Sequence, residues 1–189
     1  MIFDLLELTS QDKYRLLSGG VTPRPIAWIS TCSEDGVDNL APFSFFTVVS
    51  CEPPVLMYSQ INQTSGTDKD TLLNLKATGE CVINIVNSQL LEKMNATSAS
   101  VNFDVSEFDA FKVESCLSNT VKPLSVKLSP IRYECTLRDI HSISDSPAGG
   151  TIVLLDVKSV YVEDELYNDG NISQLLINTV GKMGGGYYS

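Results

Sequence analysis

Short apolar runs separated by polar turns dominate the chain, and this pattern predicts a protein built mainly of β-strands. The runs are rich in Val, Ile, Phe and Tyr, and clusters of Gly, Pro, Asn, Asp and Ser separate them. We expect strands at residues 26–31, 39–44, 45–50, 55–59, 81–86, 126–129, 131–140 and 151–162. So many short strands with turn signals between them favour an antiparallel barrel with short peripheral helices.

Helical signals are limited to a few short segments. Ser10 is a candidate N-cap for a helix over residues 11–17. A second helix is expected to start at Asp70 or Thr71, its candidate caps, and to stop at Gly79, which accepts the left-handed conformation of a helix end. Further helical segments are expected at residues 88–96 and 106–108.

The first long strand, residues 26–31, is too apolar to leave either of its faces in water. Arg24 precedes it between Pro23 and Pro25, two residues that stiffen the backbone. Because Pro25 has no N–H for a ladder, it is expected at the start or the edge of the sheet. Arg24 then has two interpretations, a partner of a phosphate or carboxylate across an interface, or an ordinary surface arginine.

Residues 39–44, Asn-Leu-Ala-Pro-Phe-Ser, combine groups that are unusual for a plain strand. Pro42 removes a ladder N–H, and Asn39 and Ser44 place polar groups beside Phe43. This combination suits a flat, partly polar ligand that lies against exposed backbone. The alternative is a β-bulge in which the aromatic residues simply fill the core.

Lys69, Asp70 and Thr71 stand where a polar loop, residues 60–68, gives way to a helix. A helix start offers N–H groups and a partial positive charge, and a lysine and a hydroxyl add to both, so a phosphate fits there. An ordinary capped helix start with a solvated lysine is the alternative. Ser59 and Gln60 end a strand at the start of the same loop, where a strand-end cap is their ordinary interpretation.

Composition narrows the class of protein. The chain has 189 residues, 43% apolar and 19% charged, which predicts one globular domain over residues 1–189. Its net charge of −10 and its scattered basic residues argue against nucleic acid and against an anionic membrane surface as partners. The chain shows no signal-like start and no membrane-length apolar run, so we expect a cytoplasmic protein.

Motifs for other chemistries are missing from the sequence. Five cysteines are scattered without a Cys-x-x-Cys pair, so we expect reduced, mostly buried thiols and no bound metal. The single histidine, His141, is expected to be a partly exposed loop residue. Neither a Gly-x-Gly-x-x-Gly nor a Gly-x-Ser-x-Gly segment occurs.

The order of these motifs resembles the flavin reductase-like family of FMN-binding split barrels. The likeness extends over nearly the whole chain, and several motifs in the right order are far more specific than one alone. It rests on Pro-Arg-Pro-Ile-Ala at 23–27, Asn-Leu-Ala-Pro-Phe-Ser at 39–44, Glu-Pro-Pro at 52–54, Lys-Asp-Thr at 69–71 and Gly-Glu-Cys-Val-Ile-Asn at 79–84. The resemblance implies an antiparallel Greek-key split β-barrel.

The same resemblance implies FMN bound at the interface of a homodimer, and electrons that come from NAD(P)H or a redox partner. A C-terminal segment, residues 184–188, would lie near the flavin, or alternatively it frays. The flavin would carry the chemistry, so no catalytic protein residue is expected. The cofactor-binding residues that the resemblance implies are Arg24, Thr31, Asn39, Ala41, Pro42, Phe43, Ser44, Ser59, Gln60, Lys69, Asp70, Thr71 and Lys182.

The function expected from this likeness is that of an NAD(P)H-dependent flavin reductase, which passes electrons through FMN to a free flavin, a partner oxygenase or a metal ion. A flavoredoxin-like electron carrier, or an FMN-binding protein without a nicotinamide site, is the main alternative. A third interpretation is an interaction domain that kept the fold and lost the cofactor. The last would be colourless and would not bind FMN.

Overall fold

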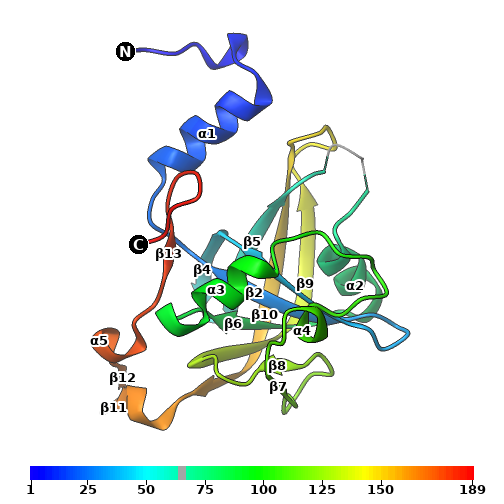
Figure 1. Ribbon diagram of the computed structural model, residues 1–189, viewed down its shortest axis with the longest axis vertical. Helices are drawn as coiled ribbons and strands as arrows, with labels where there is room; N and C mark the ends of the chain where they lie inside the picture. Colours follow the sequence, from blue (N-terminus) through cyan, green and yellow to red (C-terminus); the bar gives the residue numbers. More distant parts are fainter. Residues whose placement is uncertain (64–66) are drawn as a thin grey trace.

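A single curved antiparallel sheet forms the body of the protein (Figure 1). The computed structural model describes residues 1–63 and 67–189, so residues 64–66 of the predicted polar loop lie outside the described residues. Seven strands are ordered β3-β2-β6-β9-β10-β5-β4 in the sheet. Their bounds are β2 (Ala27–Cys32), β3 (Asp38–Phe43), β4 (Phe45–Cys51), β5 (Pro54–Ile61), β6 (Glu80–Ile85), β9 (Ile131–Ser142) and β10 (Gly150–Val162).

The two edges of this sheet are adjacent in sequence. β3 is one edge strand and β4 is the other, and only Ser44 separates them along the chain. The sheet must therefore curl until its edges approach each other at Ser44. No ladder pairs β3 with β4 among the described residues, so the barrel stays open along this line. The antiparallel barrel that the pattern predicts is thus present, and its open line fits the split barrel that the resemblance implies.

Most predicted strands form, with a few changed bounds. β9 and β10 run longer than expected and pair across two irregularities, next to Leu154 and next to Ser159. The strand expected at 126–129 shrinks to β8 (Ser125–Val126), which pairs only with β7 (Ser115–Cys116). Ser129 donates its hydroxyl to the carbonyls of Ile85 and Ile131, each at 2.8 Å, and Pro130 has no N–H to extend a ladder.

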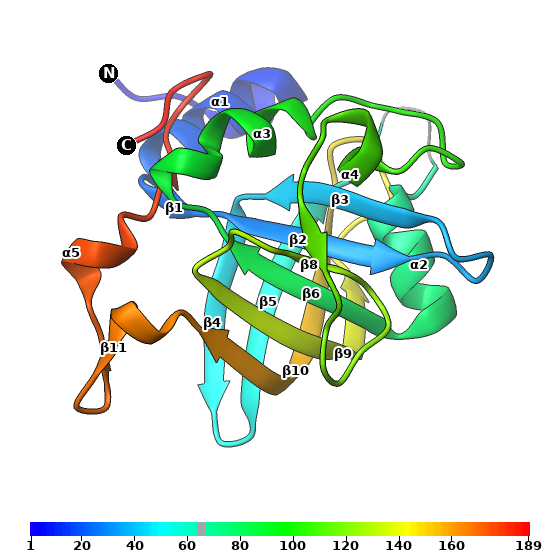
Figure 2. The same cartoon turned by 60° about the horizontal axis from the view of Figure 1, so that its bottom comes forward.

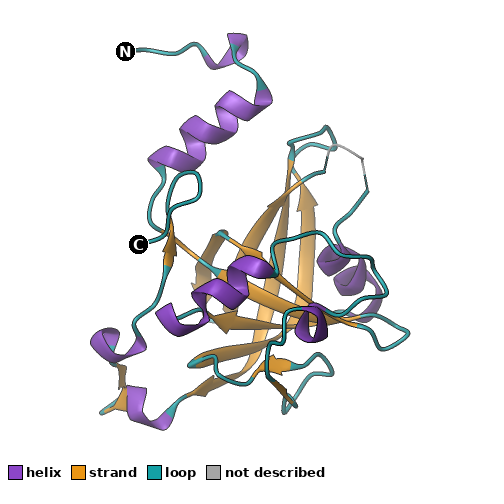
Figure 3. Cartoon of the chain, viewed as in Figure 1, coloured by secondary structure: helices purple, strands orange, loops and turns teal. Residues whose placement is uncertain are grey.

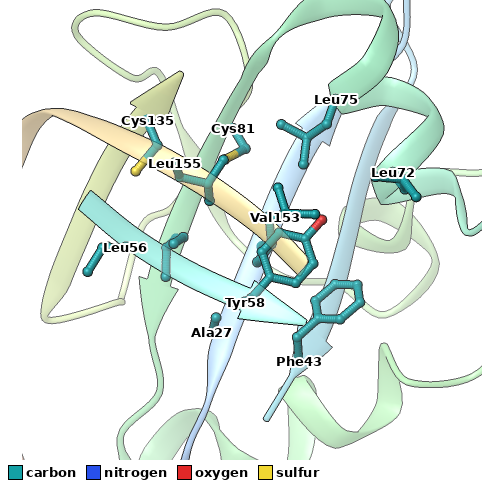
Figure 4. Packing of buried hydrophobic residues seen from close by; sticks show 12 residues of the cluster. Ala27, Phe43, Leu56, Tyr58, Leu72, Leu75, Cys81, Cys135, Val153 and Leu155 are labelled. Atoms are coloured by element: carbon teal, nitrogen blue, oxygen red, sulfur yellow. The ribbon is translucent and has the colours of Figure 1, made fainter. Parts of the chain in front are cut away.

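The inside of the barrel is filled by apolar side chains from the sheet and from one helix (Figure 4). Ala27 and Ile29 of β2 point into this interior core. Leu72 and Leu75 enter it from α2 (Asp70–Thr78), which therefore packs against the barrel wall. The full set is Ala27, Ile29, Phe43, Leu56, Tyr58, Leu72, Leu75, Cys81, Ile83, Cys135, Val153 and Leu155.

A second core covers the outer face of β2 and β3, where α3 (Leu91–Ala96) and α4 (Glu107–Ala110) lie (Figure 2). Trp28 is fully buried there, and its Nε1 donates to the hydroxyl of Thr97 at 2.9 Å. Because Ile26 and Trp28 face this outer core while Ala27 and Ile29 face the interior, every residue of β2 is buried. The prediction that neither face of this strand meets water is confirmed.

Short helices and ribbons surround the sheet (Figure 3). The N-terminal helix is capped by Thr9, not Ser10, because the Thr9 hydroxyl accepts from the Asp12 N–H at 3.2 Å. None of the helices among residues 1–63 and 67–189 is long and apolar enough to cross a membrane. The remaining elements are η1 (Leu5–Glu7), α1 (Ser10–Gly20), β1 (Arg24–Pro25), η2 (Ser88–Leu90), η3 (Asp164–Leu166), β11 (Tyr167–Asn168), β12 (Asn171–Ile172), α5 (Gln174–Ile177) and β13 (Gly181–Lys182).

The expectation that most of the cysteines are buried is confirmed. All five are free thiols, and Cys32, Cys81 and Cys135 are buried. His141 is exposed as predicted, but it belongs to β9 and not to a loop, and its Nε2 lies 3.0 Å from the carboxylate of Asp139.

Candidate functional site

Two clefts meet at the line where the barrel is open. The first, the β3–α2 cleft, has a volume of about 360 Å³ and lies between β3, the start of α2, residues 97–101 and α4. The second, the β3–β5 cleft, has a volume of about 370 Å³ and lies between the β3–β4 junction, the end of β5 and Tyr14 of α1. Both clefts include Pro42, Phe43 and Lys69, so they adjoin. Each volume falls within the range of about 300–1,000 Å³ that is usual for ligand pockets.

Lys69 is the only basic side chain that lines either cleft within the described part of the chain. Its Nζ lies 5.2 Å from the centre of the Phe43 ring, a cation–π distance. Among the described residues it has no ion-pair partner, since Asp68 pairs instead with Lys76 at 2.6 Å. Burial lowers the pKa of Lys69. A half-buried cation without a carboxylate partner is suited to an anionic ligand.

The start of α2 adds backbone donors to the same cleft. Lys69 occupies the N-cap position without capping through its side chain, so the prediction of Asp70 or Thr71 as the cap is wrong. The N–H groups of Leu72 and Leu73 bond to the Lys69 carbonyl, at 2.9 and 3.0 Å. Those of Asp70 and Thr71 precede them in the first turn, where N–H groups have no intrahelical partner. With the helix dipole, these N–H groups are suited to an anion beside Lys69.

A buried polar network lies behind these donors and joins four elements. Asn39 of β3 is its centre, and its Oδ1 accepts from the hydroxyls of Thr31 at 3.2 Å and Thr71 at 2.9 Å. Asn74 of α2 donates to the Thr31 hydroxyl at 3.0 Å. The Asn39 Nδ2 donates to both carboxylate oxygens of Glu107, each at 3.1 Å. Two predicted site residues, Thr31 and Thr71, are therefore hydrogen-bonded to a third, Asn39.

Glu107 is the residue of this site that the sequence analysis missed. Its carboxylate is buried, lines the β3–α2 cleft and also accepts the Leu40 N–H at 2.8 Å. Burial raises its pKa, and the nearby charge of Asp70 acts in the same direction, although hydrogen bonds from Leu40 and Asn39 act against both. Burial also raises the pKa of Asp70. The sequence signals only a helical turn at 106–108, which α4 confirms.

Aromatic and polar side chains line the β3–β5 cleft together. Phe43 packs against Tyr58 (Figure 4), with the ring centres 4.8 Å apart and the rings tilted by 49°. Phe43 therefore also fills core, as the alternative interpretation expects. Ser44 and Ser59 are half-buried beside them. Gln60 is buried, and its Oε1 has no hydrogen-bond partner among the described residues. An unsatisfied buried acceptor at a cleft wall suits a ligand that donates a hydrogen bond.

Three predicted site residues line neither cleft: Arg24, Lys182 and Thr31, which is buried in the network around Asn39. Arg24 is buried, so the surface interpretation is wrong, and its guanidinium donates to the carbonyls of Ser18, Val21 and Met183. It thereby ties α1 and the C-terminal segment to β1, and its Nε donates to the Ser44 hydroxyl at 3.3 Å. Lys182 pairs with Arg24 across β1 and β13, and its Nζ lies 4.1 Å from the centre of the Tyr188 ring.

The remaining predicted residues gather at the clefts. Ala41 and Pro42 are half-buried on β3. Because β3 is an edge strand, the sheet tolerates a residue there that has no N–H. The predicted residues brought together by the two clefts are Asn39, Ala41, Pro42, Phe43, Ser44, Ser59, Gln60, Lys69, Asp70 and Thr71.

Comparison with known proteins agrees with this architecture. Residues 19–179 match the family described as "Flavin reductase like domain". An uncharacterized protein of Aquifex aeolicus is 36% identical over 189 residues, which cover all of this chain and 94% of that protein.

Two solved structures are similar over the whole chain. Nitrilotriacetate monooxygenase component B from Bacillus cereus is 29% identical with a TM-score of 0.95, and the match covers 94% of that chain. A Shewanella frigidimarina protein described as having a split barrel domain is 24% identical with a TM-score of 0.86, also over 94% of its length. The second likeness confirms the split-barrel fold.

The raised pKa of Glu107 predicts how acid affects folding. Its carboxyl takes up a proton at a higher pH in the folded chain than in the unfolded chain, where 4.5 is the ordinary value. The stability that this difference gives is complete below pH 4.5 and is lost as the pH rises through the folded pKa. Urea unfolding between about pH 8 and pH 4 should therefore show the wild type gaining stability relative to Glu107→Gln as the pH falls.

Glu134 supplies a control of opposite sign. Burial alone would raise its pKa, but the N–H of Asn119 and the hydroxyl and N–H of Thr120 outweigh burial and lower it. Relative to Glu134→Gln, the wild type should lose stability as the pH falls through the folded pKa of Glu134. A difference between wild type and Glu107→Gln that stays constant with pH would contradict the account of Glu107.

Proposed function

The chain belongs to the flavin reductase-like family, and from this premise we propose that it binds FMN in the two adjoining clefts and acts as an NAD(P)H-dependent flavin reductase. The family and the likeness to a monooxygenase component make it a flavin-related oxidoreductase. The cofactor, the electron donor and the site residues are our proposal.

The single observation that carries the proposal is the half-buried Lys69, which has no ion-pair partner among residues 1–63 and 67–189, beside the first turn of α2. A cation and backbone N–H groups at one helix start fit one phosphate group. One such site suits the monophosphate of FMN better than the diphosphate of FAD. The residues present therefore fit FMN, with Lys69 and the N–H groups of Asp70 and Thr71 holding its phosphate.

The β3–β5 cleft suits the flavin ring. Phe43 and Pro42 offer apolar surface on its wall, and Gln60 and Ser44 offer polar groups at its rim. These side chains would orient the ring and exclude water from one of its faces. When bound, the flavin supplies the redox chemistry, and the protein contributes binding, orientation and electrostatics. We therefore assign no protein nucleophile and no obligatory acid or base.

The electron acceptor is proposed from the comparisons. The Bacillus cereus protein that resembles this chain is component B of a monooxygenase. A partner oxygenase that receives electrons from this chain is consistent with that likeness. A free flavin or a metal ion would be reached through the same open clefts.

We also propose a homodimer with FMN at its interface. α1 stands away from the barrel in Figure 1 and buries only Ser18. Leu17 on α1 and Val48 on β4 are 58% and 60% exposed, which is high for large apolar side chains. Tyr14 of α1 reaches the β3–β5 cleft, so a second chain packed on α1 would lie close to the proposed flavin site.

Lys69→Ala should weaken FMN binding by roughly 1.5–3 kcal/mol, which is about 10- to 150-fold, because it removes a charge-assisted hydrogen bond to the phosphate. Riboflavin, which has no phosphate, should lose much less affinity. Fluorescence titration measures both ligands, and Lys127→Ala, which removes an exposed lysine that lines neither cleft, is the matched control. An FMN dissociation constant that Lys69→Ala leaves unchanged would remove Lys69 from the site.

Oxidation of NADH or NADPH tests the activity itself. The purified protein should oxidise at least one of them under steady-state conditions when FMN is added, and mass spectrometry of any released chromophore should find FMN. Binding of FMN without oxidation of either nucleotide would instead indicate an electron carrier. A colourless protein that fails to bind FMN would overturn the proposal and leave the interaction domain.

Light scattering tests the assembly. At micromolar concentration the protein should have twice the mass of the 20.6 kDa chain. An obligate interface usually buries about 2,000 Å² or more, so such a dimer should stay together at this concentration. The double substitution Leu17→Glu and Val48→Glu should lower this mass. A wild-type monomer that still binds FMN would contradict the proposed dimer.

A further inference from the structure

We infer that Glu107 is a positioning residue of the flavin site, which holds β3 and the start of α2 in one arrangement through the side-chain amide of Asn39. This inference rests on the proposed function, because it concerns the same clefts. Glu107 and Asn39 stand 68 positions apart in the chain, so α4 must fold onto β3 before the contact exists.

The chemistry of the partners fixes the direction of every hydrogen bond. An ionised carboxylate only accepts, so Glu107 requires the donor end of the Asn39 amide to face α4. The acceptor end then faces the hydroxyls of Thr31 and Thr71, and both must donate to it. Asn74 completes the order, because its amide donates to the Thr31 hydroxyl that has already used its proton.

The result is a rigid join between the two walls of the β3–α2 cleft. Thr71 belongs to the first turn of α2, next to Lys69, and its side chain is committed to Asn39. Asn39 and Leu40 belong to β3, and both donate to Glu107. One carboxylate therefore sets where the proposed phosphate donors of α2 stand relative to the strand that would carry the ring.

A buried acid is an unfavourable neighbour for an anion site. Glu107 lines the same cleft as Asp70, and both carboxylates oppose a phosphate there, with Lys69 as the cleft's cation. A neutral acceptor would avoid this repulsion but would not fix the orientation of the Asn39 amide. We therefore attribute the carboxylate at position 107 to its ability to accept hydrogen bonds without donating any.

Replacement by glutamine sets the two properties of Glu107 against each other. It removes the charge that opposes a phosphate, and it adds a donor where the carboxylate could only accept. In Glu107→Gln the new amide still accepts from the Leu40 N–H, but its NH₂ group faces the NH₂ group of Asn39. Rotation of the Asn39 amide by half a turn removes that conflict and reverses the bonds to Thr31 and Thr71. The Thr71 hydroxyl then accepts where it had donated, so the start of α2 takes a different position relative to β3, although the size of the side chain at position 107 is preserved.

The test compares Glu107→Gln with Glu134→Gln. Glu134 is also buried and accepts two backbone N–H groups, from Asn119 at 2.8 Å and Thr120 at 2.6 Å, but it lines neither cleft. In ¹⁵N-labelled protein without flavin, the amide resonances of Asp70 and Thr71 should shift in Glu107→Gln and not in Glu134→Gln. FMN affinity should fall roughly 10- to 150-fold in Glu107→Gln alone, the range for one charged hydrogen bond, and riboflavin affinity should fall less.

The outcomes separate this inference from the proposed function. Unchanged Asp70 and Thr71 resonances in Glu107→Gln would overturn it, as would equal losses of FMN affinity in the two variants. Wild-type protein that binds FMN, with Glu107→Gln binding equally well, would overturn the inference alone. Wild-type protein that does not bind FMN would overturn the proposed function and this inference with it.

Discussion

The passage of the chain from one edge of the sheet to the other across Ser44 is the constraint on which the rest of the structure depends. β3 and β4 can stand at opposite edges and still be consecutive only if the sheet curls almost into a closed barrel. The two edges meet without a ladder, and both clefts open along that line. Pro42 fits this arrangement because an edge strand tolerates a residue without an N–H. The site is thus a consequence of incomplete closure.

The backbone groups of an open edge strand need hydrogen-bond partners other than a neighbouring strand. The network around Asn39 supplies one and holds the strand in place. Glu107 accepts the Leu40 N–H, which another strand would take in a closed barrel. The same carboxylate orients Asn39, and Asn39 anchors the first turn of α2. Structure and proposed function therefore use one set of contacts, and Lys69 lines the same cleft.

The features that could be predicted from the sequence are those signalled by residues that are close together in the chain. The strands and the helix end at Gly79 follow from residues close together in sequence, and so do the cleft residues Phe43 and Lys69. Arg24 was misjudged because its burial depends on carbonyls of α1 and of Met183, which is 159 positions away. Glu107 was missed for the same reason, since nothing near it in the chain signals that its partner is Asn39. The roles of Arg24 and Glu107 depend on contacts between segments that are far apart in the sequence, and residue spacing does not reveal such contacts.

The most direct test of the account is a crystal structure of the protein with FMN. The account predicts phosphate oxygens within hydrogen-bond distance, about 2.7–3.2 Å, of the Lys69 Nζ and of the first N–H groups of α2, with the ring across Phe43 in the β3–β5 cleft. A flavin bound elsewhere, for example in the groove lined by Pro23, Ile26 and Val180, would contradict it.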